Sequence, residues 1–197
     1  KPVSAMGMTK ALQEKLILSD EITKDKTTFC CVRYGNVLGS RGSVIPLWDK
    51  RLEQNKPLPI THPDMTRFML TLTQAIDLVF YSLKYAKGGE IFVKKSPSTK
   101  MVNLARAYAE LKTGKKNYPL DYIGIRAGEK IDEILVSEEE MRHVKEEKDH
   151  YIIKREAEID KKFEKKNTKF AEYSSGTVNH LDVEQLKTMM KKLKWTI

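Results

Sequence analysis

The stretch TTFCCVRYGNVLGSRGS, residues 27–43, decides the fold that we expect for this chain. Its first part, residues 27–37, is rich in β-branched and apolar residues, which is typical of a buried β-strand. Its second part is punctuated by Gly35, Gly39 and Gly42, which favour a loop. The stretch therefore predicts a buried strand that runs into a flexible polar loop.

Helical and extended patterns alternate on both sides of this stretch. Apolar residues at helical spacing and Ser4 as a possible N-cap predict a helix over residues 4–19. The other expected elements are helices over 43–54, 73–86, 103–111 and 182–193, an extended stretch from 57 to 61, and strands over 91–93 and 121–125. Such alternation favours an α/β fold with parallel strands wherever a helix crosses over.

Cysteine use and hydropathy predict a cytoplasmic protein. Cys30 and Cys31 are adjacent, which is poor geometry for a disulfide, so we expect both thiols in the core of a strand in a reducing compartment. The first residues do not form a secretory signal, and no apolar stretch approaches the length of a membrane span. We therefore expect neither export nor stable membrane insertion.

The charge pattern argues against nucleic-acid binding. The chain carries a net charge of +9, which would suit a phosphate backbone if it were clustered. However, the densest charged run, residues 141–169, holds nearly as many acids as bases, which indicates a solvated surface. Residues 142–170 have no assignable role. The histidines are isolated from one another, so we expect no metal site.

The first candidate for chemistry is the pair Met6 and Lys10. Their spacing sets both side chains on one face of the first helix, one turn apart. Taken alone, this pattern is better explained by a helix with a chance lysine than by a catalytic motif. The motifs that follow favour the catalytic interpretation.

Several further motifs occur in a fixed order. They are Val32–Val37, Gly39–Pro46, Ile60–Thr61, Pro63–Phe68, Lys95–Pro97 and Arg126–Lys130. Together with Met6 and Lys10 they resemble the capsular-polysaccharide branch of the UDP-N-acetylglucosamine 4,6-dehydratases, within the extended short-chain dehydrogenase/reductase family. The resemblance covers residues 1–140 continuously and, more loosely, residue 173 to the end.

The resemblance implies the later half of a Rossmann-like doubly wound sheet, with strands near 28–37 and 90–95, and a smaller α/β substrate-binding subdomain. Residues 1–140 would hold both parts, and 141–197 would be a C-terminal extension. The missing initiator Met and the missing glycine-rich dinucleotide turn lead us to expect the C-terminal part of a longer enzyme, inactive alone. A homo-oligomer is also implied.

The resemblance further implies NADP, or NAD, as cofactor and a UDP-sugar as substrate. Lys10 would hold the nicotinamide ribose, and Tyr34 and Gly35 would also contact the cofactor. Met6 stands at the position where the family usually has its catalytic Tyr. In this respect the chain resembles the branch of the family that inverts C5. The expected substrate-binding residues are Asn36, Arg41, Val44, Thr61, Arg67, Arg126 and Glu129. For each Arg the alternative is an ordinary surface salt bridge.

The implied reaction oxidises C4 of UDP-N-acetylglucosamine, eliminates water across C5 and C6, and returns hydride to C6. A UDP-sugar 4-epimerase is the first alternative, although Met6 argues against it because a thioether cannot carry the C4 proton. A non-catalytic UDP-sugar-binding module is the alternative from another class.

Overall fold

The computed structural model describes residues 2–19, 26–40, 42–154 and 170–192. The chain forms two compact units, and each is assembled from separate segments. Unit 1 comprises Lys1–Gly35, Leu72–Ser96 and Ile134–Ser174, and unit 2 comprises Asn36–Thr71, Pro97–Glu133 and Ser175–Ile197. Residues beyond 140 thus contribute to both units, whereas the sequence predicts one C-terminal extension over 141–197.

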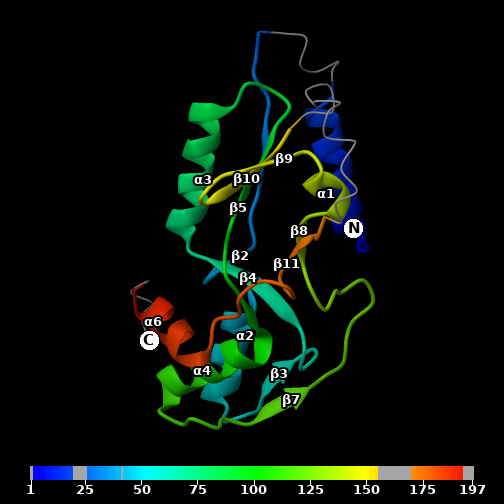
Figure 1. Cartoon of the computed structure of the whole chain (residues 1–197). Coiled ribbons are helices and arrows are strands. Elements are labelled where there is room, and N and C mark those ends of the chain that lie inside the picture. Colours follow the sequence, from blue (N-terminus) through cyan, green and yellow to red (C-terminus); the bar gives the residue numbers. More distant parts are fainter. Residues whose placement is uncertain (1, 20–25, 41, 155–169, 193–197) are drawn as a thin grey trace. The chain divides into compact units, whose positions relative to one another are not determined.

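Unit 1 is built on a mixed sheet (Figure 1). Its strand order is β1 (Cys31–Arg33), β5 (Ile91–Lys94), β10 (His150–Ile153) and β9 (Val144–Glu146). β1 and β5 are parallel, and the helix α3 (Leu72–Tyr85) lies between them in the sequence and packs on both. This confirms the predicted parallel pair with a helical crossover, because parallel strands need a long connection.

Unit 1 also contains the helix α1 (Ala5–Ile17), which confirms the first predicted helix. Ser4 caps it, since the backbone N–H of Gly7 donates to Ser4 Oγ at 3.1 Å. The two-stranded sheet of β8 (Ile134–Val136) and β11 (Tyr173–Ser174) and the short helix α5 (Glu138–Met141) complete the unit.

The predicted strand over residues 27–37 is wrong in its extent. β1 ends at Arg33, and the next strand, β2 (Asn36–Val37), belongs to a different sheet in unit 2. Cys30 and Cys31 are free and only half-buried, contrary to the expected core position. The reason is that β1 is an edge strand of its sheet within the described residues, so one side lacks a neighbour.

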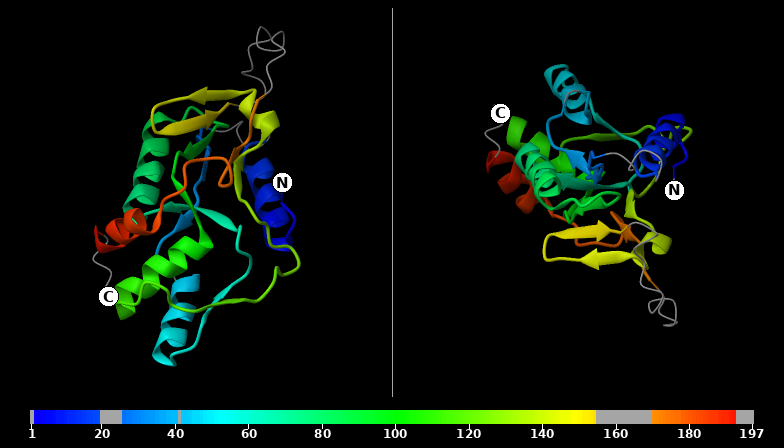
Figure 2. Two further views of the ribbon diagram at one scale, coloured as in Figure 1. Left: turned by 60° about the horizontal axis from the view of Figure 1, so that its bottom comes forward. Right: turned by 90° about the horizontal axis from the view of Figure 1, so that it is seen from above.

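The charged run after residue 141 contains a hairpin that the sequence did not predict. β9 and β10 pair antiparallel, and β10 also pairs with β5 through Ile152 opposite Phe92 (Figure 2, yellow). Lys95 Nζ lies 2.6 Å from Glu146 Oε1 and 2.7 Å from the Glu147 carbonyl oxygen. The apolar run Tyr-Ile-Ile at 151–153 is the local sequence feature that could have predicted the strand β10. The acids of residues 155–169 lie outside the described residues.

Unit 2 contains two small sheets. One has the order β2, β4 (Thr66–Leu70) and β6 (Ser98–Lys100), and the other pairs β3 (Leu58–Ile60) with β7 (Leu120–Tyr122) in parallel. β4 was not predicted as a strand, although Phe68 and Leu70 are fully buried in it. β7 is shorter than the strand predicted over 121–125.

Among the described residues of unit 2, three helices cover the core. They are α2 (Val44–Glu53), α4 (Met101–Thr113) and α6 (Val183–Lys192), and α4 packs along α6 (Figures 1 and 2). Leu186 and Met190 of α6 are fully buried, which confirms the stripe predicted there, while Leu193 lies outside the described residues. Asn55 has a φ of 52°, so the chain turns away from α2 before the prolines expected to end it.

None of the helices in the described residues combines the length and apolar character that crossing a bilayer needs.

Candidate functional site

A pocket of about 440 Å³ lies entirely within unit 2. Loops at the carboxyl ends of β2, β3 and β7 form part of its wall, together with the first turns of α2 and α4. The carboxyl ends of parallel strands are where open α/β sheets bind their ligands. Six of the residues that the sequence predicts for substrate binding line it: Asn36, Val44, Thr61, Arg67, Arg126 and Glu129.

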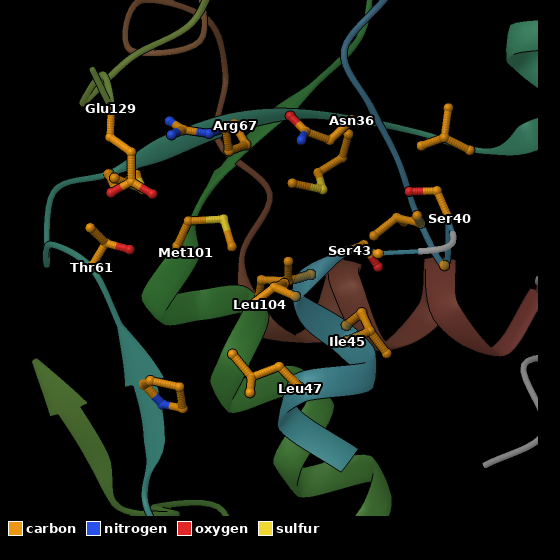
Figure 3. A pocket seen from close by; sticks show the side chains of 18 of the residues that line it. Asn36, Ser40, Ser43, Ile45, Leu47, Thr61, Arg67, Met101, Leu104 and Glu129 are labelled. Carbon is orange, nitrogen blue, oxygen red and sulfur yellow. The ribbon is translucent and has the colours of Figure 1, made fainter. Parts of the chain in front are cut away.

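The pocket has a polar side and an apolar side. In Figure 3, Asn36, Arg67 and Glu129 lie along the top, whereas Leu47 and Leu104 lie below them. A site with a few polar groups against an apolar wall suits a small ligand that has both a charged and a flat or apolar part.

The N-terminus of α2 opens into this pocket. Ser43 is the N-cap residue, as the sequence predicts, but its side chain makes no capping hydrogen bond. Its Oγ atom is buried and has no hydrogen-bond partner among the described residues. Since the first N–H groups of a helix also lack partners within the helix, this corner of the pocket favours an anionic group. Sequence reasoning did not predict that Ser43 lines the site.

Arg67 reaches the pocket from β4 and is held tightly. Its guanidinium donates to the carbonyl oxygens of Thr66 at 2.6 Å, Ile131 at 3.0 Å and Lys130 at 3.0 Å. Burial lowers the pKa of Arg67, and the Glu133 carboxylate, 3.7 Å from its Nε, opposes that effect. The side chain therefore places a fixed positive charge in the polar wall.

Arg126 and Glu129 belong to one tight turn. The Arg126 backbone N–H donates to Glu129 Oε2 at 3.0 Å, and the Glu129 N–H donates back to the Arg126 carbonyl oxygen at 3.1 Å. Gly128 adopts a φ of 81° inside this turn, a conformation that glycine allows without strain. The Glu129 carboxylate thus shapes the turn that brings Arg126 to the pocket.

The remaining predicted residues lie in unit 1 or outside the described residues. Met6 and Lys10 project from α1, both exposed, and Met6 keeps 72% of its surface open. Lys10 makes no hydrogen bond or ion pair among the described residues. Tyr34 is 42% exposed, and Gly35 follows it at the end of the first segment of unit 1. Arg41 lies outside the described residues.

No group of three potential metal ligands occurs in the part of the chain that the structure describes.

Solved structures define the class of this fold. A dTDP-glucose 4,6-dehydratase from Bacillus anthracis in complex with NAD matches 65% of this chain and 42% of its own, with a TM-score of 0.55 and 19% identity. A UDP-glucuronic acid 4-epimerase from Bacillus cereus matches 66% and 43%, with a TM-score of 0.57 and 21% identity. This chain shares the α/β fold of these two solved structures, which confirms the predicted fold class.

The chain belongs to the polysaccharide biosynthesis protein family, whose model matches residues 1–155. Pen from Bacillus thuringiensis is 35% identical and covers 98% of this chain and 59% of its own, with a TM-score of 0.85. A protein from Rickettsia bellii named UDP-glucose 4-epimerase is 41% identical over 202 residues, 98% of this chain and 59% of the relative. The chain thus spans about three fifths of the length of these relatives.

Proposed function

We propose that this chain forms the substrate-binding part of an NADP- or NAD-dependent UDP-sugar 4,6-dehydratase acting on UDP-N-acetylglucosamine. The observation that carries the choice of dehydratase is Met6, one helical turn before Lys10 on the exposed face of α1. A thioether has no proton to exchange. Met6 therefore cannot transfer the C4 hydroxyl proton, as the tyrosine of a tyrosine-dependent epimerase does.

The pocket supports a nucleoside diphosphate as the shared part of the ligand. Arg126, Arg67 and the N-terminus of α2 would supply positive charge and N–H donors to the two phosphates. The unpartnered Ser43 hydroxyl would donate to a phosphate oxygen. Asn36, Thr61 and Glu129 would exchange hydrogen bonds with the ribose, uracil or sugar hydroxyls, and Val44 would pack against them.

Lys10 would donate a hydrogen bond to the nicotinamide ribose and bring positive charge near the sugar C4 oxygen. Tyr34 and Gly35 would contact the same cofactor. When bound, the nicotinamide would supply hydride transfer from C4 to C6, and the C4 hydroxyl proton would pass to a base. Loss of the C5 proton and the C6 hydroxyl as water would separate the two hydride transfers. A proton from solvent then returns to C5, on the opposite face if C5 is inverted.

UDP-sugar 4-epimerase is the second candidate, because curated relatives such as the Rickettsia bellii protein carry the name UDP-glucose 4-epimerase. An epimerase also takes hydride from C4, but it returns hydride to C4 on the other face. The substrate keeps its mass and its C5 proton. The two functions therefore differ in a directly measurable product.

The test is to incubate the complete gene product separately with UDP-N-acetylglucosamine and UDP-glucose, with catalytic NADP or NAD, in deuterated water. Mass spectrometry together with NMR of the nucleotide sugar then distinguishes the candidates. Loss of one water with deuterium at C5 supports the dehydratase. An isomer of unchanged mass without deuterium supports the epimerase and contradicts the dehydratase. Binding of UDP-sugar without any reaction would indicate a non-catalytic module.

A further inference from the structure

Arg126 and Glu129 belong to a loop whose C-terminal end, residues 132–133, is held by hydrogen bonds to a row of buried hydroxyl groups. Thr66 Oγ1, on β4, lies 2.6 Å from Asp132 Oδ1 and 2.6 Å from Ser175 Oγ. The backbone N–H of Glu133 donates to the same Ser175 Oγ at 2.8 Å. Thr66 is 3% exposed and Ser175 is fully buried, so water does not compete for these bonds.

The direction of each hydrogen bond in this row follows from the chemistry of the groups. A carboxylate only accepts, so the single hydroxyl proton of Thr66 points to Asp132. Ser175 must then donate its own proton to Thr66, while it accepts from the N–H of Glu133. Loss of the Thr66 hydroxyl would leave both Asp132 and Ser175 without this partner in a buried site, which is costly.

Ser175 is itself fixed by neighbours on two sides. Its carbonyl oxygen accepts from Ser98 Oγ at 2.7 Å and lies 2.9 Å from His180 Nε2. The segment around residues 175–180 therefore ties the loop to β6 as well as to β4. Nothing in the local sequence pattern indicates this, because Ser175 and Thr66 are 109 residues apart.

Residues of β4 also form hydrogen bonds with residues 130–131 of the same loop. Arg67 donates to the carbonyl oxygens of Lys130 and Ile131, and the backbone N–H of Thr66 donates to the Ile131 oxygen at 2.9 Å. Residues 130–133 are thus bonded to β4 at successive positions. The turn of Arg126 and Glu129 begins directly before this anchored segment.

We propose that Thr66 and Ser175 are positioning residues that set the affinity of the pocket for a nucleoside diphosphate. They act by holding the anchored segment so that Arg126 and Glu129 face the ligand, which rests on the proposed function of the pocket. Neither Thr66 nor Ser175 is among the described residues that line the pocket. Their effect on binding must therefore pass through the loop.

The matched variants for the test are Thr66→Val and Thr66→Ser in the complete gene product. Val keeps the shape of Thr and removes the hydroxyl, whereas Ser keeps the hydroxyl. Calorimetric titration with UDP should give a Kd raised about tenfold in Thr66→Val, the effect expected for one buried hydrogen bond. Thr66→Ser should remain within about twofold of the wild type.

Two further measurements separate positioning from general destabilisation. Met190 is a buried residue of α6, a helix that does not line the pocket. Met190→Ala should leave a cavity in the core and lower the thermal midpoint of unfolding, but it should not change the affinity for UDP. Hydrogen exchange at the Glu133 amide should speed up in Thr66→Val and stay unchanged relative to its neighbours in Met190→Ala. Ser175→Ala provides the same readouts if Thr66→Val does not fold.

Each outcome decides the proposal. Wild-type UDP affinity in Thr66→Val would overturn it, as would a loss of affinity of equal size in Met190→Ala. If the wild-type protein does not bind UDP, the proposed function fails instead, and hydrogen exchange decides the positioning role alone. In that case, faster exchange confined to residues 126–133 supports the role, and unchanged exchange overturns it.

Discussion

A Cβ atom at Gly176 would lie 2.5 Å from Oδ2 of Asp132, closer than real Cβ contacts come. The three atoms that this Cβ would meet all belong to the Asp132 side chain. Asp132 accepts the hydrogen bond from Thr66, so it cannot move away without giving up that bond. The absence of a side chain at Gly176 therefore leaves room for the Asp132 carboxylate at the place where it accepts the hydrogen bond from Thr66.

This relationship predicts a thermodynamic cycle. Gly176→Ala should lower the free energy of unfolding by about 1 to 3 kcal/mol, the usual cost of overpacking. In an Asp132→Ala background the same substitution should cost much less, since the clashing atoms are gone. Denaturant unfolding of the four proteins measures the coupling. Equal costs in both backgrounds would mean that Gly176 is required for another reason.

Ser43→Ala should separate stability from binding. The Ser43 hydroxyl is buried without a partner, so its removal should leave the free energy of unfolding within about 0.5 kcal/mol of the wild type or raise it. UDP affinity should fall several-fold if the hydroxyl donates to a phosphate. Ser137→Ala is the matched control, because Ser137 caps α5 by accepting from the Glu140 N–H. That variant should lose about 1 kcal/mol of stability and bind UDP normally.

Glu140 should give unit 1 a measurable acid sensitivity. Burial raises the pKa of Glu140, but its bonds to Arg33 outweigh this and hold the pKa below the ordinary value of 4.5. A lowered folded-state pKa contributes stability that is complete above about pH 4.5 and is lost as pH falls through the folded-state pKa. Glu140→Gln should therefore be less stable than the wild type at neutral pH, and the difference should shrink below about pH 4.

Thermal unfolding midpoints of the two proteins across this pH range check the prediction. Gln at this position can still bond to the Ser137 N–H, so the capping box is retained and the comparison isolates the contact with Arg33. A difference that does not vary with pH would contradict the role assigned to the Arg33 contact.

Lys10→Ala in the complete gene product should lose nearly all turnover and keep the wild-type affinity for UDP. The reason is that Lys10 lies on α1, whereas the pocket is formed by unit 2 residues alone. Lys10→Arg, which keeps the charge, should recover part of the rate. Steady-state rates and UDP titrations measure both quantities, and wild-type turnover in Lys10→Ala would refute its assignment.

The sequence was sufficient for the elements whose signal is local. The helices α1, α3 and α4 follow from apolar residues at helical spacing, which act within a few turns of one chain segment. It also supplied, through ordered motifs, the family and six residues that the fold brings to one pocket. Those motifs are far apart in the sequence, and the resemblance alone connected them.

Only the tertiary structure decided how distant segments share their hydrogen bonds. The break between β1 and β2 depends on which strands lie beside them, and the β9–β10 hairpin forms because β5 offers it an edge. The link from Thr66 to Ser175 and Asp132 satisfies buried polar groups that local pattern cannot pair. A side chain's partners across the fold depend on packing in three dimensions, whereas periodicity reports only which face of its own element it occupies.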